Sequence, residues 1–229
     1  MESAWLSLWL SLRLAALVAV LLLLLSMPLA YWLSQTRWRG KFLIESIVAL
    51  PLVLPPTVLG FYLLTAMGTN GFLGKLWTAW FGHTLAFTFT GLVLASVLYS
   101  LPFAVQPLVT SFESVDTRLL HAAAILGAGR WRTFRQILLP LSVPGVVTAV
   151  VLSFAHTLGE FGVVLMVGGN LPGITRTVSI DIYDRVQSLE YQQANRMSLA
   201  LLLISFAVLA TIYALNRRVW SPWPSRRAS

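Results

Sequence analysis

Long uncharged apolar segments, separated by short polar clusters, make up most of this chain. A helix needs roughly 20 apolar residues to cross a bilayer. Five stretches meet that requirement, at about residues 14–34, 46–65, 85–108, 137–157 and 197–215. The pattern therefore predicts an all-α, multi-pass membrane protein with five spans inside a transmembrane domain at residues 14–216.

Two shorter apolar segments leave the number of spans open. Residues 4–12 are too short to cross a bilayer alone, so residues 1–13 are predicted to form an N-terminal interfacial segment. An extension of the first span is the alternative, and a sixth span at the N-terminus stays possible. Residues 161–169 are also apolar and short, which predicts a partial span or re-entrant helix that must be buried in protein.

Composition supports the membrane class and excludes several others. The chain is 57% hydrophobic and 10% charged, with a mean hydropathy of +0.78, whereas soluble domains carry about 25% charged residues. The net charge of +8 comes from short basic clusters between apolar runs, which indicates membrane topology and not nucleic-acid binding. The absence of cysteine from the sequence excludes disulfides and thiolate metal sites.

The basic residues also predict an orientation. Lys and Arg are concentrated in the segments that follow the first, third and fifth spans, and they are sparse or diluted by acids elsewhere. Because cytoplasmic loops are enriched in Lys and Arg, the N-terminus is predicted to be periplasmic and residues 217–229 to form a cytoplasmic basic tail. The residues that set this bias are Arg37, Arg39, Lys41, Arg118, Arg130, Arg132, Arg135, Arg217, Arg218, Arg226 and Arg227.

The predicted cytoplasmic loop at residues 113–136 has a distinctive pattern. It predicts two short helical stretches broken at Gly127–Gly129, where glycine permits a turn that other residues resist. Trp131, Phe134 and Ile137 follow at helical spacing and predict one apolar stripe. From periodicity alone, a short amphipathic helix lying on lipid fits equally well.

The spacing in this loop resembles the EAA motif of ABC-importer permeases, E-A-A-x3-G-x9-I-x-L-P. The resemblance implies a type I importer permease fold in which the loop docks into a groove of a separate ATPase subunit. His121 stands where the family has glutamate, so its role is open. The predicted coupling residues are His121, Ala122, Ala123, Gly127, Ala128, Arg130, Trp131, Phe134, Ile137, Leu139 and Pro140.

The chain carries no recognisable nucleotide site of its own. The segment at residues 71–75 ends like a phosphate loop but lacks the required spacing and the following Ser or Thr. We therefore expect no cofactor on this chain, with ATP and Mg used by the partner ATPase.

Two further stretches resemble the oxyanion branch of the importer permeases, and most closely its molybdate permeases. G-E-F-G at residues 159–162 and the G-N-x-P that follows it are shared with sulfate and thiosulfate permeases, whereas P-P-T-V-x-G at residues 55–60 and T-x-T-x-S-I-x-I-Y-D at residues 175–184 look more like the molybdate permeases. The paired prolines predict a kink inside the second span. Candidate residues of the translocation path or gate are Pro55, Pro56, Thr57, Glu160 and Phe161. Glu160 itself would repel a dianion, so we expect it outside the path, at the outer surface and paired with His156.

The resemblance implies the permease subunit of an ATP-driven importer in the bacterial inner membrane, with molybdate as cargo. Sulfate, thiosulfate or tungstate are alternative cargoes, because these oxyanions are chemically similar. The implied partners are a second copy of the chain, two cytoplasmic ATPase subunits, a periplasmic oxyanion-binding protein and the lipid bilayer.

Two other classes of membrane protein fit less well. A membrane-embedded enzyme needs a cluster of catalytic or metal-binding side chains, but the three histidines are far apart in sequence, and His156 with Glu160 supplies only two ligands. A secondary transporter needs coupling-ion ligands near mid-membrane, and no convincing set is present. We therefore predict no catalytic residue and no metal site.

Overall fold

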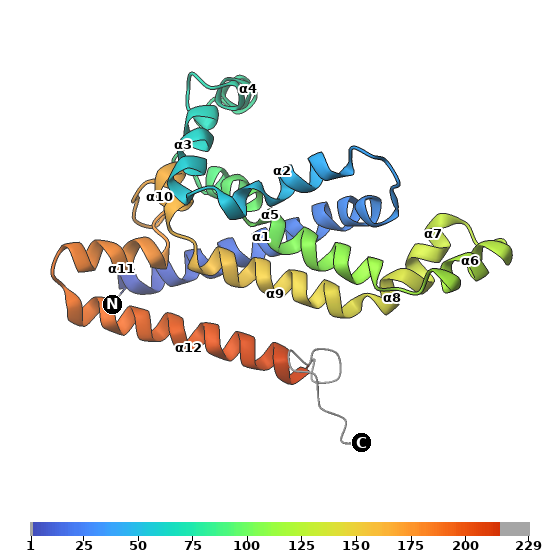
Figure 1. The fold of residues 1–229 in the computed structure, drawn as a ribbon. Helices are drawn as coiled ribbons and strands as arrows, with labels where there is room; N and C mark the ends of the chain where they lie inside the picture. Colours follow the sequence, from blue (N-terminus) through green and yellow to red (C-terminus); the bar gives the residue numbers. More distant parts are fainter. Residues whose placement is uncertain (1, 216–229) are drawn as a thin grey trace.

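The computed structural model describes residues 2–215 and folds them into helices joined by short turns, with no strand among those residues (Figure 1). The first helix, α1 (Glu2–Gln35), is continuous from the N-terminus. Residues 2–13 therefore extend the first helix, where the pattern predicted a separate segment. Two reasons account for this. These residues contain no proline or glycine that would end the helix, and they pack against a helix at residues 178–187 in the C-terminal half of the chain.

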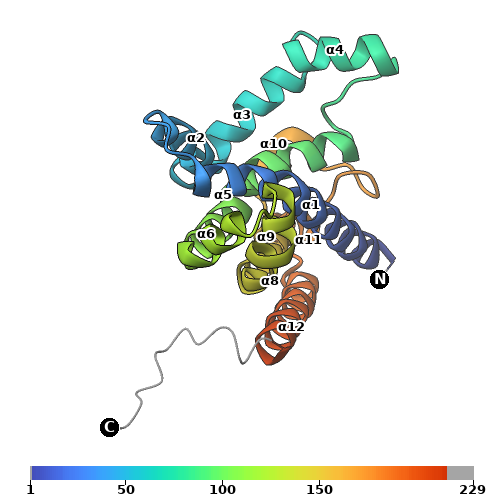
Figure 2. The same cartoon turned by 90° about the vertical axis from the view of Figure 1, so that its right-hand side faces the viewer.

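The second predicted span is broken in two. Helix α2 (Lys41–Val53) and helix α3 (Pro56–Met67) meet at an angle of 111°. Pro55 caps α3 and Pro56 is its first residue, while Leu54 before them is extended. A proline disfavours the helical conformation of the residue that precedes it, so the paired prolines produce the predicted kink. Helix α4 (Phe72–Phe81) follows α3 and projects from the main bundle (Figures 1 and 2).

Three long helices form the centre of the molecule. Helices α5 (Phe89–Glu113) and α9 (Val143–Gly159) pack against each other and against α1. Their shared core includes the fully buried side chains of Leu14, Leu22, Leu92, Leu108 and Ala149. Between α5 and α9 the chain forms α6 (Thr117–Ile125), α7 (Arg130–Thr133), a π-helical turn (Phe134–Leu138) and α8 (Leu139–Leu141).

The C-terminal half begins with a short helix inside the bundle. Helix α10 (Gly162–Gly168) buries Val163, Val164 and Val167 completely and packs on α3 and α5. This burial fits the partial or re-entrant helix predicted for this segment. Helices α11 (Val178–Gln187) and α12 (Tyr191–Leu215) follow, and α12 lies at the edge of the bundle (Figure 2). The predicted basic tail at residues 217–229 lies outside the described residues.

Span-length helices can be counted within residues 2–215. Helices α1, α5 and α12 are each long and apolar enough to cross a membrane. The bent pair α2–α3, and the bent pair formed by residues 130–141 with α9, bring the total to five if each pair is one span. The all-helical, multi-span architecture predicted from the sequence is confirmed.

Candidate coupling surface and translocation path

The segment predicted to couple with an ATPase forms a helical hairpin at the end of the bundle opposite the N-terminus (Figure 1). Asp116 caps α6, where its carboxylate accepts a hydrogen bond from the Arg118 backbone N–H at 2.8 Å. Gly127 then turns the chain with a φ of +78°, and α7 begins at Arg130. This left-handed conformation is accessible to glycine at little cost. The two helical stretches broken at Gly127–Gly129 are therefore present as the sequence predicted.

The tip of this hairpin is apolar and uncovered by its own chain. Ile125 is 85% exposed, Leu126 is 86% exposed and Trp131 is 71% exposed. Large apolar side chains gathered at an exposed tip indicate a surface that another molecule covers. Of the other predicted coupling residues, Ala123 is buried and Ala128, Ile137 and Leu139 are partly buried, while His121, Ala122, Gly127, Arg130 and Pro140 are exposed.

The base of the hairpin is fixed by aromatic contacts. Phe134 packs edge-to-face on Tyr31 of α1, with ring centroids 5.0 Å apart, and contacts Phe112 of α5 at 6.1 Å. The predicted apolar stripe is present: the Trp131 ring stacks on the Phe134 ring with centroids 5.7 Å apart, and Trp131 stays exposed while Phe134 and Ile137 are partly buried. A π-helical turn runs from Phe134 to Leu138, and period counting along the sequence could not anticipate it.

The two segments predicted to line a path come together in space. A side-chain carbon at Gly162 would lie 2.7 Å from Cβ of Pro56, and one at Gly60 would lie 2.8 Å from Cβ of Met166. Glycine therefore lets the backbones of α3 and α10 approach closely. Pro55, Pro56 and Thr57 lie at the N-terminal end of α3 and each remains exposed. Residues more than 100 positions apart, which the sequence singled out separately, form one packed unit.

Glu160 lies between α9 and α10 and is buried, contrary to the expectation that it sits at the outer surface. Its exposed fraction is 4%, and neither carboxylate oxygen has a hydrogen-bond partner within residues 2–215. The hydroxyl of Ser96 on α5 faces this carboxyl group without reaching ordinary hydrogen-bond geometry. Phe161, the adjacent candidate, is partly buried and contacts the Tyr183 ring at a centroid distance of 5.0 Å.

His156 has a different partner from the predicted one. Its Nδ1 shares a hydrogen bond of 2.9 Å with the Ser100 hydroxyl, which also lies 3.1 Å from the Thr157 hydroxyl. The imidazole stacks on Phe103 with a centroid distance of 3.9 Å. The predicted pairing of His156 with Glu160 is therefore wrong: the histidine links α9 to α5. Ser100 is one of the hydroxyl-bearing residues of the third predicted span, but nothing in the sequence indicates that it pairs with His156.

A second polar link was missed by the sequence analysis. On α1, the Ser7 hydroxyl donates to the Asp181 carboxylate at 2.8 Å, and the Ser11 hydroxyl accepts from the Val178 backbone N–H at 2.8 Å. Asp181 also accepts a hydrogen bond from Arg185 at 2.9 Å. These bonds attach α11 to the N-terminal half of α1. The spacing of Ser7 and Ser11 by one helical turn was the available signal.

Comparison with known proteins agrees with this architecture. The family model described as "Binding-protein-dependent transport system inner membrane component" matches residues 23–221. The molybdenum transport system permease protein ModB of Azotobacter vinelandii is 55% identical over 191 residues, covering 83% of this chain and 84% of the relative. The sulfate transport system permease protein CysT of Escherichia coli (strain K12) is 34% identical over 190 residues, covering 83% of this chain and 68% of the relative.

Solved structures share the fold at much lower identity. A bacterial ABC transporter involved in alginate import matches with a TM-score of 0.80 at 17% identity, covering 96% of this chain and 81% of that chain. The MetNI methionine ABC transporter matches with a TM-score of 0.72 at 16% identity, covering 94% and 95%. The arrangement of helices around the projecting hairpin is thus the importer permease fold. The chain is a multi-pass inner-membrane protein and belongs to the family of binding-protein-dependent transport system inner membrane components.

Proposed function

We propose that this chain is the translocation subunit of an ATP-driven importer and that its cargo is molybdate. The observation that carries the cargo is the 55% identity to a molybdenum transport permease, against 34% to a sulfate permease. Molybdate and sulfate are both tetrahedral dianions, so the cargo is proposed from sequence similarity and not from the chemistry of individual side chains. No step of covalent chemistry is assigned to this chain, because its task is to provide a path and a gate.

The α6–α7 hairpin is the proposed docking element for a separate ATPase subunit. Its exposed tip, formed by Ile125 and Leu126, supplies the apolar surface that such a contact would cover. Its base is held between α1 and α5 through Phe134, so that movement of the tip is transmitted to two central helices. This arrangement supports rigid-body rocking of the spans as the gating motion.

The packed unit of α3 and α10 is the proposed gate region. It combines Pro55, Pro56 and Thr57 with the segment that carries Glu160 and Phe161. A dianion path should avoid fixed negative charge, and the burial of Glu160 away from any open surface is compatible with that requirement.

The proposed assembly rests on the family to which the chain belongs. We propose a homodimer in which each copy docks one ATPase subunit on the cytoplasmic side, with the N-terminus periplasmic and a periplasmic oxyanion-binding protein delivering the cargo. The exposed large apolar side chains of α2 and α3, including Ile47, Val53, Phe61 and Tyr62, are available for a second copy or for lipid.

Uptake into proteoliposomes that hold the chain, its ATPase and its binding protein tests the proposal. Labelled molybdate is supplied with excess sulfate, and the labels are then exchanged. We expect ATP-dependent molybdate uptake that survives sulfate. Uptake of labelled sulfate in the presence of excess molybdate would show that sulfate is the cargo. Uptake that does not require the ATPase would overturn the assignment to an ATP-driven importer.

Coupling through the hairpin has its own test. Gly127→Ala places a side chain at a φ of +78°, whereas Gly129→Ala adds one at an ordinary φ with open space around it. The strain at Gly127 is expected to cost about 1–2 kcal/mol and to distort the hairpin. We expect Gly127→Ala to lower transport per ATP hydrolysed while Gly129→Ala retains it. Equal coupling in the two variants would contradict the docking role of this turn.

A further inference from the structure

Two cavities adjoin each other where α1 meets the base of the α6–α7 hairpin. The first, of about 480 Å³, is lined by Tyr31 and Gln35 of α1, by Thr36 just after it, and on the hairpin side by Thr133 and Leu120 among others. The second, of about 440 Å³, is apolar and runs along α1 toward the middle of the helix. Tyr31, Arg130 and Phe134 line both cavities, which therefore adjoin, and we refer to the pair as one groove with a polar end at the first cavity and an apolar end at the second.

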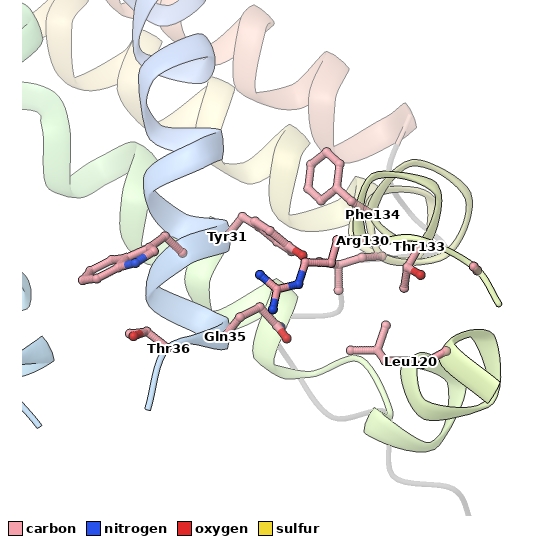
Figure 3. A pocket seen from close by; sticks show the side chains of 11 residues that line it. Tyr31, Gln35, Thr36, Leu120, Arg130, Thr133 and Phe134 are labelled. Carbon is pink, nitrogen blue, oxygen red and sulfur yellow. The ribbon is translucent and has the colours of Figure 1, made fainter. Parts of the chain in front are cut away.

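Arg130 supplies the charge at the junction. Figure 3 shows its side chain reaching from α7 toward Tyr31 and Gln35. No aspartate or glutamate lines either cavity. Within residues 2–215 no carboxylate forms an ion pair with Arg130. Glu113 pairs instead with Lys41, and Asp116 caps α6. The polar end of the groove is therefore positive and suited to an anionic group.

The apolar end lies along the middle of α1. Its lining includes Leu23, Leu24, Met27 and Pro28, about two to three helical turns before the end of α1 at Gln35. At about 1.5 Å per residue, these side chains lie roughly 10–18 Å from that end. Trp131 borders this cavity and is exposed, and indole rings favour the boundary between acyl chains and headgroups.

We propose that this groove binds an anionic phospholipid, with the phosphate on Arg130 and an acyl chain along Leu23–Pro28 of α1. Basic pockets between membrane helices take anionic headgroups. A small free oxyanion would use the polar end but not the apolar end, whereas a lipid uses both. The lipid would lie between a central helix and the element proposed to dock the ATPase.

Native mass spectrometry of the full-length chain tests the site without any measurement of transport, so its outcome is independent of the cargo. The purified chain is titrated with phosphatidylglycerol or with phosphatidylethanolamine, and the bound lipid is counted. Arg130→Gln removes the proposed contact, and Arg132→Gln, on the same short helix but outside both cavities, is the matched control. Met27→Trp fills the apolar end, with Leu25→Trp, which lines neither cavity, as its control.

We expect Arg130→Gln to lower phosphatidylglycerol occupancy by about fivefold, the factor expected for losing one basic contact with an anionic headgroup. Met27→Trp should lower the occupancy of both lipids, and both control variants should retain wild-type occupancy. Equal occupancy in the two arginine variants, or equal retention of the two lipids by the wild type, would overturn the proposal. Displacement of the lipid by inorganic phosphate or molybdate would indicate a free-anion site, and absence of lipid from the wild type would indicate a groove covered by protein.

Discussion

Gly162→Ala tests whether the close contact between α3 and α10 is structurally required. The added Cβ would lie 2.7 Å from Cβ of Pro56, whereas non-bonded carbon atoms are comfortable at about 3.5–4.0 Å. The two helices must therefore separate by about 1 Å, or the rigid proline ring must shift. Neither movement is free, because Val163 and Val167 of α10 are fully buried in the same contact.

Overpacking of this kind typically costs about 1–3 kcal/mol. For a chain of 150–250 residues, each kcal/mol lowers the midpoint of thermal unfolding by about 2–4 °C, so we expect a decrease of about 2–12 °C for Gly162→Ala. Gly159→Ala is the matched control, since that position is exposed and nothing lies within 4 Å of an added carbon. It should leave the midpoint unchanged or raise it slightly, because alanine favours the helix more than glycine does.

Thermal unfolding of the two purified variants is measured first, and uptake is measured on the same preparations. If α3 and α10 form the gate, the uptake rate of Gly162→Ala should fall while that of Gly159→Ala persists. A midpoint for Gly162→Ala within about 1 °C of the Gly159→Ala value would refute the packing argument. A lowered midpoint with unchanged uptake would retain the packing but exclude this contact from the gate.

Two further predictions concern buried carboxylates. Asp181→Asn should lower the free energy of unfolding by about 1–3 kcal/mol, because Asp181 is 1% exposed and accepts hydrogen bonds from Ser7 and Arg185. Asp184→Asn removes only the partly exposed ion pair with Arg176, at 3.6 Å, and should cost under about 1 kcal/mol; equal losses in denaturant titrations would contradict this. Glu160→Gln should not lower the thermal midpoint, since the carboxyl oxygens have no hydrogen-bond partner within residues 2–215 that the substitution would remove; a clear decrease in thermal unfolding of the variant would contradict this.

Helical class, spans and the break in the coupling segment could be predicted from the sequence, because each depends on local chemistry. Uninterrupted apolar runs produce α5 and α12, and paired prolines after Leu54 force the bend between α2 and α3. Gly127 was expected to turn the chain, and it does so with a positive φ. The motif spacing also identified the family, which the comparison with known proteins confirms.

The boundaries and pairings that differ from expectation depend on groups distant in sequence. Residues 2–13 have no pattern that separates an interfacial helix from an extended span, and the hydrogen bonds from Ser7 and Ser11 to α11 form only when the chain has folded. From the sequence, the nearest polar partner for His156 is Glu160, one helical turn away. In the structure α5 and α9 pack together, and this contact places the Ser100 hydroxyl within hydrogen-bond distance of His156 instead.

The sequence by itself determined that this chain is a multi-span helical membrane protein with a turn at Gly127 and a kink at Pro55–Pro56, because hydropathy, proline and glycine act locally. Only the tertiary structure decided that the kink packs on α10 through Gly60 and Gly162, that Glu160 is buried, and that Arg130 stands at the mouth of a groove on α1. Those features depend on which faces of the helices are in contact. The contacts join segments more than 90 residues apart in sequence, such as Pro56 with Gly162 and Tyr31 with Arg130, so no local pattern predicts them.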